Sequence, residues 1–170
     1  MPSSGLPSNG SSLVRTGLLP QGGLSLDQHV DELGRTLGEE LLEPTRVYAK
    51  ACLALARGTA THAMSHVTGG GLAANLERVL PPELTVSIDR STWALPPVFW
   101  LVQQVGSVAR PDLERTLNCG VGMVALTAPG DADRALSLLA EHDVRAWVAG
   151  TVAPASDDDG GVVRLVGDHA

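Results

Sequence analysis

Apolar residues recur along the chain at two spacings, one typical of helices and the other typical of strands. Leu72, Leu76 and Leu80 lie on one face of a predicted helix, whereas Leu84 to Ile88 alternates apolar and polar positions as a half-buried strand does. Helices are predicted over residues 27–42, 44–57, 72–80, 112–117 and 131–142 and from Pro96 onward, and strands over 60–66, 84–88, 118–126, 146–152 and 162–166. This order of elements predicts an α+β fold, in which a mixed β-sheet is layered with helices.

Local signals set the expected boundaries of these elements. Ser8 or Asn9 is expected to cap a short helix, since both side chains accept hydrogen bonds from free helix N–H groups. Pro44 is expected to start the next helix at its first turn. Residues 154–161 contain three aspartates without the ligand spacing of a calcium loop, so we expect a solvent-exposed hairpin loop there.

A run of three glycines, Gly69, Gly70 and Gly71, separates the strand over 60–66 from the helix over 72–80. Glycine adopts positive φ readily, and it lets a ligand approach the backbone because it has no Cβ. The free N–H groups and the positive dipole end of the following helix favour an anion such as phosphate. By itself, the pattern fits a phosphate-binding turn and a simple tight connection equally well.

Two histidines on the predicted strand raise the question of a metal site. His62 and His66 share one face of the strand at a separation of about 13 Å. Both imidazoles cannot then bind one metal ion, and no cysteine or carboxylate completes a set of ligands, so no metal site is expected. His66 adjoins the glycine turn and is a candidate for contact with a substrate.

Five segments, in order along the chain, resemble the motifs of one family. They are Ser8-Asn9-Gly10 with Ser12 to Arg15, Leu41 to Tyr48, His66 to Pro81, Arg115 to Met123, and Ala146 to Gly150. The third segment reads H-V-T-G-G-G-L and continues through Asn75 and Arg78. Together they are similar to the signatures of the aminoimidazole ribonucleotide synthetases, also called phosphoribosylformylglycinamidine cyclo-ligases, of purine biosynthesis.

The resemblance implies a two-domain, ATP-dependent ligase, of which this chain corresponds to the second domain. Residues 1–10 are then the flexible end of the segment between the domains, and residues 11–170 form a single α+β domain. The N-terminal domain, which holds ATP and Mg²⁺ in the family, has no counterpart in the sequence. We therefore expect no cofactor in this chain alone, no activity without the other half, and a homodimer in the intact enzyme.

The resemblance also implies which residues line the site for the substrate, formylglycinamidine ribonucleotide. They are Ser8, Asn9, Gly10, His66, Thr68, Gly69, Gly70 and Gly71, and no catalytic residue is assigned. Arg46 is either a ligand for phosphate or a member of a structural ion pair. The chain departs from the family at Pro7, Ala74 and Glu77, where the family commonly has histidine, glutamate and proline, so no role of those residues carries over.

Composition narrows the range of partners. Twelve Lys and Arg against nineteen Asp and Glu give a net charge of −7, which argues against sequence-independent binding to nucleic acid. No apolar stretch reaches the roughly 20 residues of a membrane span, and the first residues lack the features of a secretory signal. Cys52 and Cys119 are expected to be buried thiols in a reducing compartment, so the cytoplasm is the expected location.

Two other functions remain open at this point. One is that of the C-terminal domain of a related ATP-using enzyme, such as selenophosphate synthetase or thiamine-phosphate kinase, although the five motifs favour the cyclo-ligase. The other is that of a stand-alone, non-catalytic module that binds a phosphorylated metabolite or another protein. A nucleotide-binding half encoded upstream would support the enzyme, and its absence would support the module.

Overall fold

The computed structural model describes residues 1–6, 10–156 and 160–170, and it confirms the α+β class. Its helices are α1 (Ser11–Thr16), α2 (Leu37–Leu41), α3 (Ala49–Gly58), α4 (Gly71–Glu77), α5 (Pro97–Val105), α6 (Arg110–Thr116) and α7 (Ala132–Glu141), with a π-helical turn η1 (Gly17–Gln21) and 3₁₀ turns η2 (Arg90–Thr92) and η3 (Pro129–Asp131). Its strands are β1 (His29–Val30), β2 (Arg35–Thr36), β3 (Thr61–His66), β4 (Leu84–Asp89), β5 (Met123–Thr127), β6 (Gly150–Pro154) and β7 (Val163–Val166). None of the described helices is long and apolar enough to cross a membrane.

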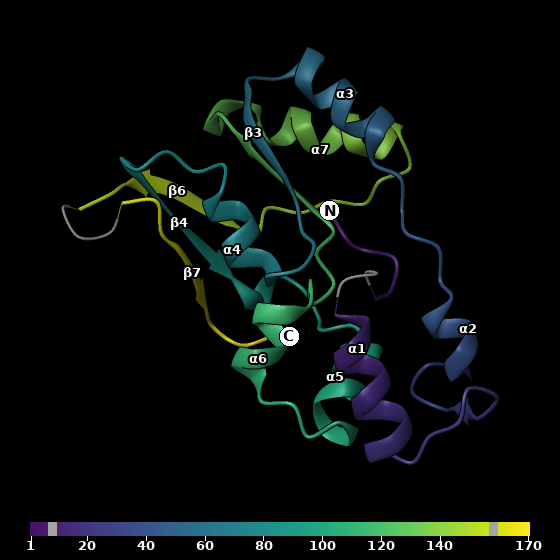
Figure 1. Cartoon of the computed structure of the whole chain (residues 1–170). Helices are drawn as coiled ribbons and strands as arrows, with labels where there is room; N and C mark the ends of the chain where they lie inside the picture. The colour runs from purple at the N-terminus through teal and green to yellow at the C-terminus, as the bar shows by residue number, and fades with distance from the viewer. Residues whose placement is uncertain (7–9, 157–159) are drawn as a thin grey trace.

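The described strands form three separate sheets (Figure 1). β3 pairs antiparallel with β5, which places His66 opposite Met123. β4 is the central strand of a mixed sheet, in which β6 lies antiparallel on one side and β7 lies parallel on the other. β1 and β2 form a small antiparallel pair. The predicted mixed sheet is therefore present, and it is confined to β6, β4 and β7.

Helices cover these sheets in groups, each with its own hydrophobic cluster. α3 and α7 lie side by side next to β3 (Figure 1), and Leu55 and Leu139 are buried between them and that sheet. α4 packs against α6, β3 and β7, and its Leu76 joins Ile88 of β4 in a second cluster. α1 and η1 pack against α5 in a third cluster, which contains Phe99 of α5. α4 thus connects the sheet that contains β3 with the sheet that contains β7, and it also contacts α6. The glycine turn directly precedes this helix.

The helix predicted over residues 27–42 is wrong. The chain forms the β1–β2 hairpin there, and only α2 is helical. Gly34 has a φ of 65°, and its N–H donates to the carbonyls of Val30 and Asp31, so it closes a turn that a helix cannot contain. A capping box between Thr36 and Glu39 then starts α2. The helical spacing of apolar residues arose because the hairpin and α2 bury their side chains in the same cluster.

The helix predicted over residues 44–57 begins too early, since α3 starts at Ala49. Residues 44–48 are held by the N-terminal segment: the Ser4 hydroxyl donates to the Pro44 carbonyl at 2.6 Å and accepts the Arg46 N–H at 2.8 Å. These contacts join residues about forty positions apart. They have no signature in the local sequence, and they outweigh the tendency of Pro44 to start a helix.

Three boundaries in the second half also differ from the prediction. The strand predicted over 118–126 is confined to β5, because Cys119 and Gly120 have positive φ and form a turn. The strand predicted over 146–152 is β6, because Ile88 pairs with Gly150 near the end of β4 and leaves the preceding residues without a partner strand. The hairpin predicted at residues 154–161 is wrong, because β6 and β7 lie on opposite sides of β4 and do not pair with each other. Residues 157–159 of that loop lie outside the described part of the chain.

Residues near the N-terminus make specific contacts. The Ser3 N–H donates to the Gly120 carbonyl at 2.9 Å, and the Gly122 N–H donates to the Met1 carbonyl at 3.1 Å. The N-cap position of α1 is Gly10. The cap predicted at Ser8 or Asn9 falls on residues outside the described part of the chain. Mobility of residues 1–10 stays a prediction. The hydrogen bonds of Met1 and Ser3 count against it for the first residues of the chain.

Candidate functional site

The glycine turn follows the predicted order of strand, turn and helix. β3 ends at His66, and Gly70 and Gly71 have φ values of 97° and 73°, a region that favours glycine. The side chain of Asn75 in α4 is buried, and its amide nitrogen donates to the carbonyls of Gly69 at 3.1 Å and Gly71 at 2.7 Å. The turn is therefore held from inside by one side chain.

Two of the three glycines have different reasons for lacking a side chain. A Cβ on Gly71 would overlap the carbonyl oxygen of Glu114 in α6, so close packing between α4 and α6 requires glycine there. A Cβ on Gly70 would make only ordinary contacts, 3.6 Å from Ala74 and 3.8 Å from the Arg78 guanidinium. The positive φ of Gly70 is therefore its main constraint.

A cavity of about 50 Å³ lies beside this turn and brings several predicted site residues together. Four segments line it, and their residues are Ser3, Ser4, Gly5, Leu6, Thr45, Arg46, Tyr48, His66, Val67, Thr68, Asn118 and Gly122. A cavity needs roughly 10–15 Å³ to hold one water molecule. It therefore has room for about one small group, such as a phosphate, and the rest of a ribotide would lie outside it.

Arg46 is the cationic residue of this cavity. Its Nε atom is buried and has no hydrogen-bond partner within residues 1–6, 10–156 and 160–170. None of the ion pairs found in that part of the chain includes Arg46. A buried donor without a partner is costly, by about 1–3 kcal/mol. Two roles were considered for Arg46, and the lack of a partner in the described residues favours binding of an anion over a structural ion pair.

Tyr48 lines the same cavity and contacts both the N-terminal segment and His66. Its hydroxyl donates to the Pro2 carbonyl at 2.6 Å, and its ring meets the His66 ring edge-on at 6.2 Å between centroids. Burial raises the pKa of Tyr48 above its ordinary value of 10.0, so the hydroxyl stays a donor at neutral pH. Gly122 lies directly against this hydroxyl, where a Cβ would overlap it. The N-terminal segment and β3 are thus held together around the cavity.

The structure unites only part of the predicted site. His66 and Thr68 line the cavity, and the glycines follow directly after Thr68. Gly10 instead lies against Thr116 and Leu117, outside the cavity lining, and Ser8 and Asn9 lie outside the described residues.

Sequence reasoning missed Ser3, Ser4 and Asn118 among the lining residues. Asn118 is buried, and its side chain accepts a hydrogen bond from the Gly120 N–H at 3.1 Å. It belongs to the R-T-L-N-C-G motif, and this motif could have identified it as a candidate site residue. Ser3 and Ser4 carry no such signal, because only the fold brings the N-terminus to the end of β3.

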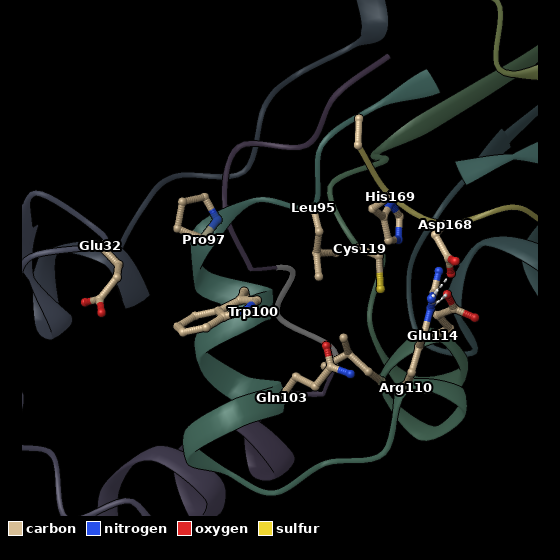
Figure 2. A pocket seen from close by; sticks show the side chains of 12 residues that line it. Glu32, Leu95, Pro97, Trp100, Gln103, Arg110, Glu114, Cys119, Asp168 and His169 are labelled. Atoms are coloured by element: carbon tan, nitrogen blue, oxygen red, sulfur yellow. Dashed lines mark hydrogen bonds and ion pairs between the residues drawn. The ribbon is translucent and has the colours of Figure 1, made fainter. Parts of the chain in front are cut away.

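A larger cavity, of about 570 Å³, lies between α5, α6 and the C-terminal segment (Figure 2). Trp100 of α5 is on one wall, and Arg110 and Glu114 of α6 are on another, where Arg110 bonds to both Glu114 and Asp168. Burial raises the pKa of the Cys119 thiol, which also lines it, to about 12. None of the predicted site residues lies among those that line this cavity.

The remaining titratable groups do not gather into a metal site in the described part of the chain, where no three His, Cys, Asp or Glu side chains are close enough to hold an ion. His62 and His66 are both exposed on β3. Both cysteines are free thiols; Cys119 is buried as predicted, whereas Cys52 is only half-buried.

Comparison with known proteins agrees with the motifs. Residues 1–163 match the family described as AIR synthase related protein, C-terminal domain. The chain is 55% identical over its whole length to a Streptomyces fradiae protein named "Putative phosphoribosylformylglycinamidine cyclo-ligase", and it covers 94% of that protein. It is 46% identical over 91% of its length to the phosphoribosylformylglycinamidine cyclo-ligase of Sorangium cellulosum, and 43% identical over 88% to that of Brevibacillus brevis.

The extent of these matches differs between the relatives. The chain spans 45% of the Sorangium protein and 43% of the Brevibacillus protein, and so less than half of each. The family match nevertheless covers nearly all of the chain. The chain belongs to the C-terminal-domain family of the AIR synthase related proteins.

Proposed function

We propose that this chain is the part of a phosphoribosylformylglycinamidine cyclo-ligase that lines the ribotide site. In that reaction ATP activates the amide oxygen of formylglycinamidine ribonucleotide, a nitrogen of the same molecule attacks that carbon, and phosphate leaves as the imidazole ring closes. The observation that carries the proposal is the unpartnered Nε of Arg46, in a cavity that also contains His66 and Thr68. Arg46 supplies a positive charge and an N–H donor without a partner, where an anionic group of the ribotide would bind.

The proposal also divides the reaction between two parts of the enzyme. ATP-dependent phosphoryl transfer depends on Mg²⁺ and on groups that cradle the phosphates, and the described residues contain no cluster fit to hold a metal ion. In this proposal ATP and Mg²⁺ are bound by a second, nucleotide-binding half, and the active assembly is a homodimer. This chain orients the ribotide and holds its anionic group away from water, and alone it turns over no ATP.

The test is reconstitution. The 170-residue chain is mixed with the nucleotide-binding half of a longer relative, and ADP release that depends on formylglycinamidine ribonucleotide is measured. ADP release from the mixture and from neither part alone is the expected result. If the chain binds the ribotide but the mixture is silent, the alternative of a non-catalytic binding module is favoured. If the chain binds no ribotide at millimolar concentration, the proposal is refuted.

The glycine turn offers a second test of the same proposal. Gly70→Val adds a branched side chain to the turn, where a Cβ makes only ordinary contacts, and disfavours its positive φ. We expect ribotide binding to be impaired far more than the melting temperature. A lower melting temperature with undisturbed affinity in the folded protein would show that the turn is only a connection.

A further inference from the structure

We infer that residues 42–47, the docking segment, bind the nucleotide-binding half of the enzyme through a free backbone edge and two exposed apolar side chains. The inference rests on the proposed function, because that function assigns ATP to another half. It adds a surface for this partner. The two apolar side chains, Leu42 and Val47, do not line the cavity beside the glycine turn.

Leu42 and Val47 are exposed to an unusual degree for apolar side chains. They are 82% and 83% exposed, whereas the other large apolar side chains of the described residues reach at most 56%. Apolar area left in water is unfavourable by roughly 25 cal/mol per Å². Scattered exposed apolar residues are common on protein surfaces, so the meaning of this pair depends on the backbone between them.

That backbone is an unpaired edge. Residues 43–48 contain no helix, strand, turn or bend, and in Figure 1 the trace between α2 and α3 runs along one side of the molecule. The Arg46 N–H points inward and donates to the Ser4 hydroxyl at 2.8 Å. Successive N–H groups of an extended chain point to opposite edges, so those of Thr45 and Val47 point outward. Neither has a hydrogen-bond partner in the part of the chain that the structure describes. Such an edge can pair with an added strand.

The position of the first residues identifies the partner. The chain matches a family described as a C-terminal domain and spans 45% of the Sorangium relative, so the additional residues of that relative precede the position of Met1. The first residues lie directly beside the docking segment, because Tyr48 donates to the Pro2 carbonyl and Ser4 donates to the Pro44 carbonyl. A half attached before Met1 is therefore held next to this surface at high effective concentration.

The proposed reaction requires the same placement. Arg46 belongs to the docking segment and lines the cavity. Transfer of a phosphoryl group from ATP to the ribotide brings the reacting atoms to about 3–3.5 Å from each other. The nucleotide-binding half must then cover the entrance of the cavity, beside Leu42 and Val47. Apolar contacts around such an entrance exclude water from it.

The experiment measures association of the 170-residue chain with the nucleotide-binding half of the Sorangium relative by calorimetry, with circular dichroism as a check that both are folded. Leu42→Ser and Val47→Ser are combined in one chain, because they remove apolar surface without changing charge. This double variant is expected to bind the half at least tenfold more weakly, as loss of a central interface contact does. Val148→Ser is the matched control, since Val148 is exposed outside the docking segment, and its affinity should change less than twofold.

Amide exchange tests the backbone pairing. Addition of the half is expected to slow exchange of the Thr45 and Val47 N–H groups at least tenfold. Equal affinity of the double variant and the wild type would overturn the inference, as would unchanged exchange at both amides. A wild-type chain that forms a dimer in sedimentation, where the double variant is monomeric, would overturn it in favour of a second copy as the occupant.

Ribotide binding by the chain alone separates this inference from the proposed function. The double variant is expected to bind formylglycinamidine ribonucleotide as tightly as the wild type, because neither side chain lines the cavity. A wild-type chain that binds no ribotide refutes the proposed function. A chain that binds the ribotide, but docks the half equally well with and without Leu42 and Val47, refutes the docking surface and leaves the proposed function standing.

Discussion

Gly71 and Glu114 lie so close that the backbones of α4 and α6 meet at this point. The carbonyl oxygen of Glu114 occupies the place where a side chain at position 71 would begin. The last glycine of the turn is therefore required by packing, whatever the turn binds. Gly70 has no backbone neighbour this close, so the constraint on it is its positive φ.

Gly71→Ala is accordingly expected to be much more destabilising than Gly70→Ala. The first combines an overlap with backbone and a φ of 73°, for a loss of about 3 kcal/mol or more. The second meets only its φ of 97°, for a loss of about 1–2 kcal/mol. Gly130→Ala is the control, because nothing lies near its Cβ position, and it should change stability by less than about 0.5 kcal/mol. Urea unfolding measures all three, and equal losses at 70 and 71 would contradict the packing argument.

Glu114 also joins two arginines in one half-buried cluster. It accepts two hydrogen bonds from Arg90, at 2.7 and 2.8 Å, and one from Arg110 at 3.1 Å. Burial alone would raise the pKa of Glu114, but the hydrogen bonds and charges of both arginines outweigh it and hold that pKa below the ordinary 4.5. A carboxylate with a lowered pKa contributes stability that is present above pH 4.5 and is lost as pH falls through its folded-state pKa.

Glu114→Gln is therefore expected to destabilise the protein by about 3 kcal/mol at pH 7, because Arg90 loses its charged partner and Arg110 keeps only the exposed Asp168. The difference between wild type and variant should shrink as pH falls below 4.5. Unfolding curves at several pH values measure it. Asp112→Asn removes an exposed partner of Arg115 and should cost less than about 1 kcal/mol. A Glu114→Gln difference that stays constant down to pH 3 would contradict this account.

The hydrogen bond from Tyr48 to Pro2 is expected to hold the N-terminal segment against the cavity. Tyr48→Phe removes only the hydroxyl, and the loss should be about 1 kcal/mol. Amide exchange should quicken at Ser3 and Gly122, whose N–H groups donate to Gly120 and Met1. Hydrogen-exchange NMR measures this. Unchanged exchange at both amides would show that the segment is held by other contacts.

The elements predicted well from the sequence are those whose signals are local. Alternation identified β4, apolar spacing identified α4 and α7, and the glycine run identified the turn between β3 and α4. Two of the failures concern residues whose conformation depends on distant partners. Ser4 keeps residues 44–46 out of a helix, and the end of β4 determines where β6 begins.

The candidate site divides in the same way. The motif resemblance pointed to His66, Thr68 and Arg46, and the fold brings them to one cavity. The family resemblance could not show that Arg46 lacks a partner in the described residues, because that depends on which side chains surround it in space.

The central claim is that Arg46 is kept for an anionic group of the ribotide and not for stability. Arg46→Met tests it most directly, with Arg57→Met as the control, because Arg57 is exposed on α3 and does not line the cavity. We predict that Arg46→Met weakens binding of formylglycinamidine ribonucleotide by roughly 10-fold or more, the loss of a charged hydrogen bond. Its unfolding free energy should equal or exceed that of wild type, because an unsatisfied buried donor is removed. A destabilised Arg46→Met protein that binds the ribotide as tightly as wild type would contradict the claim.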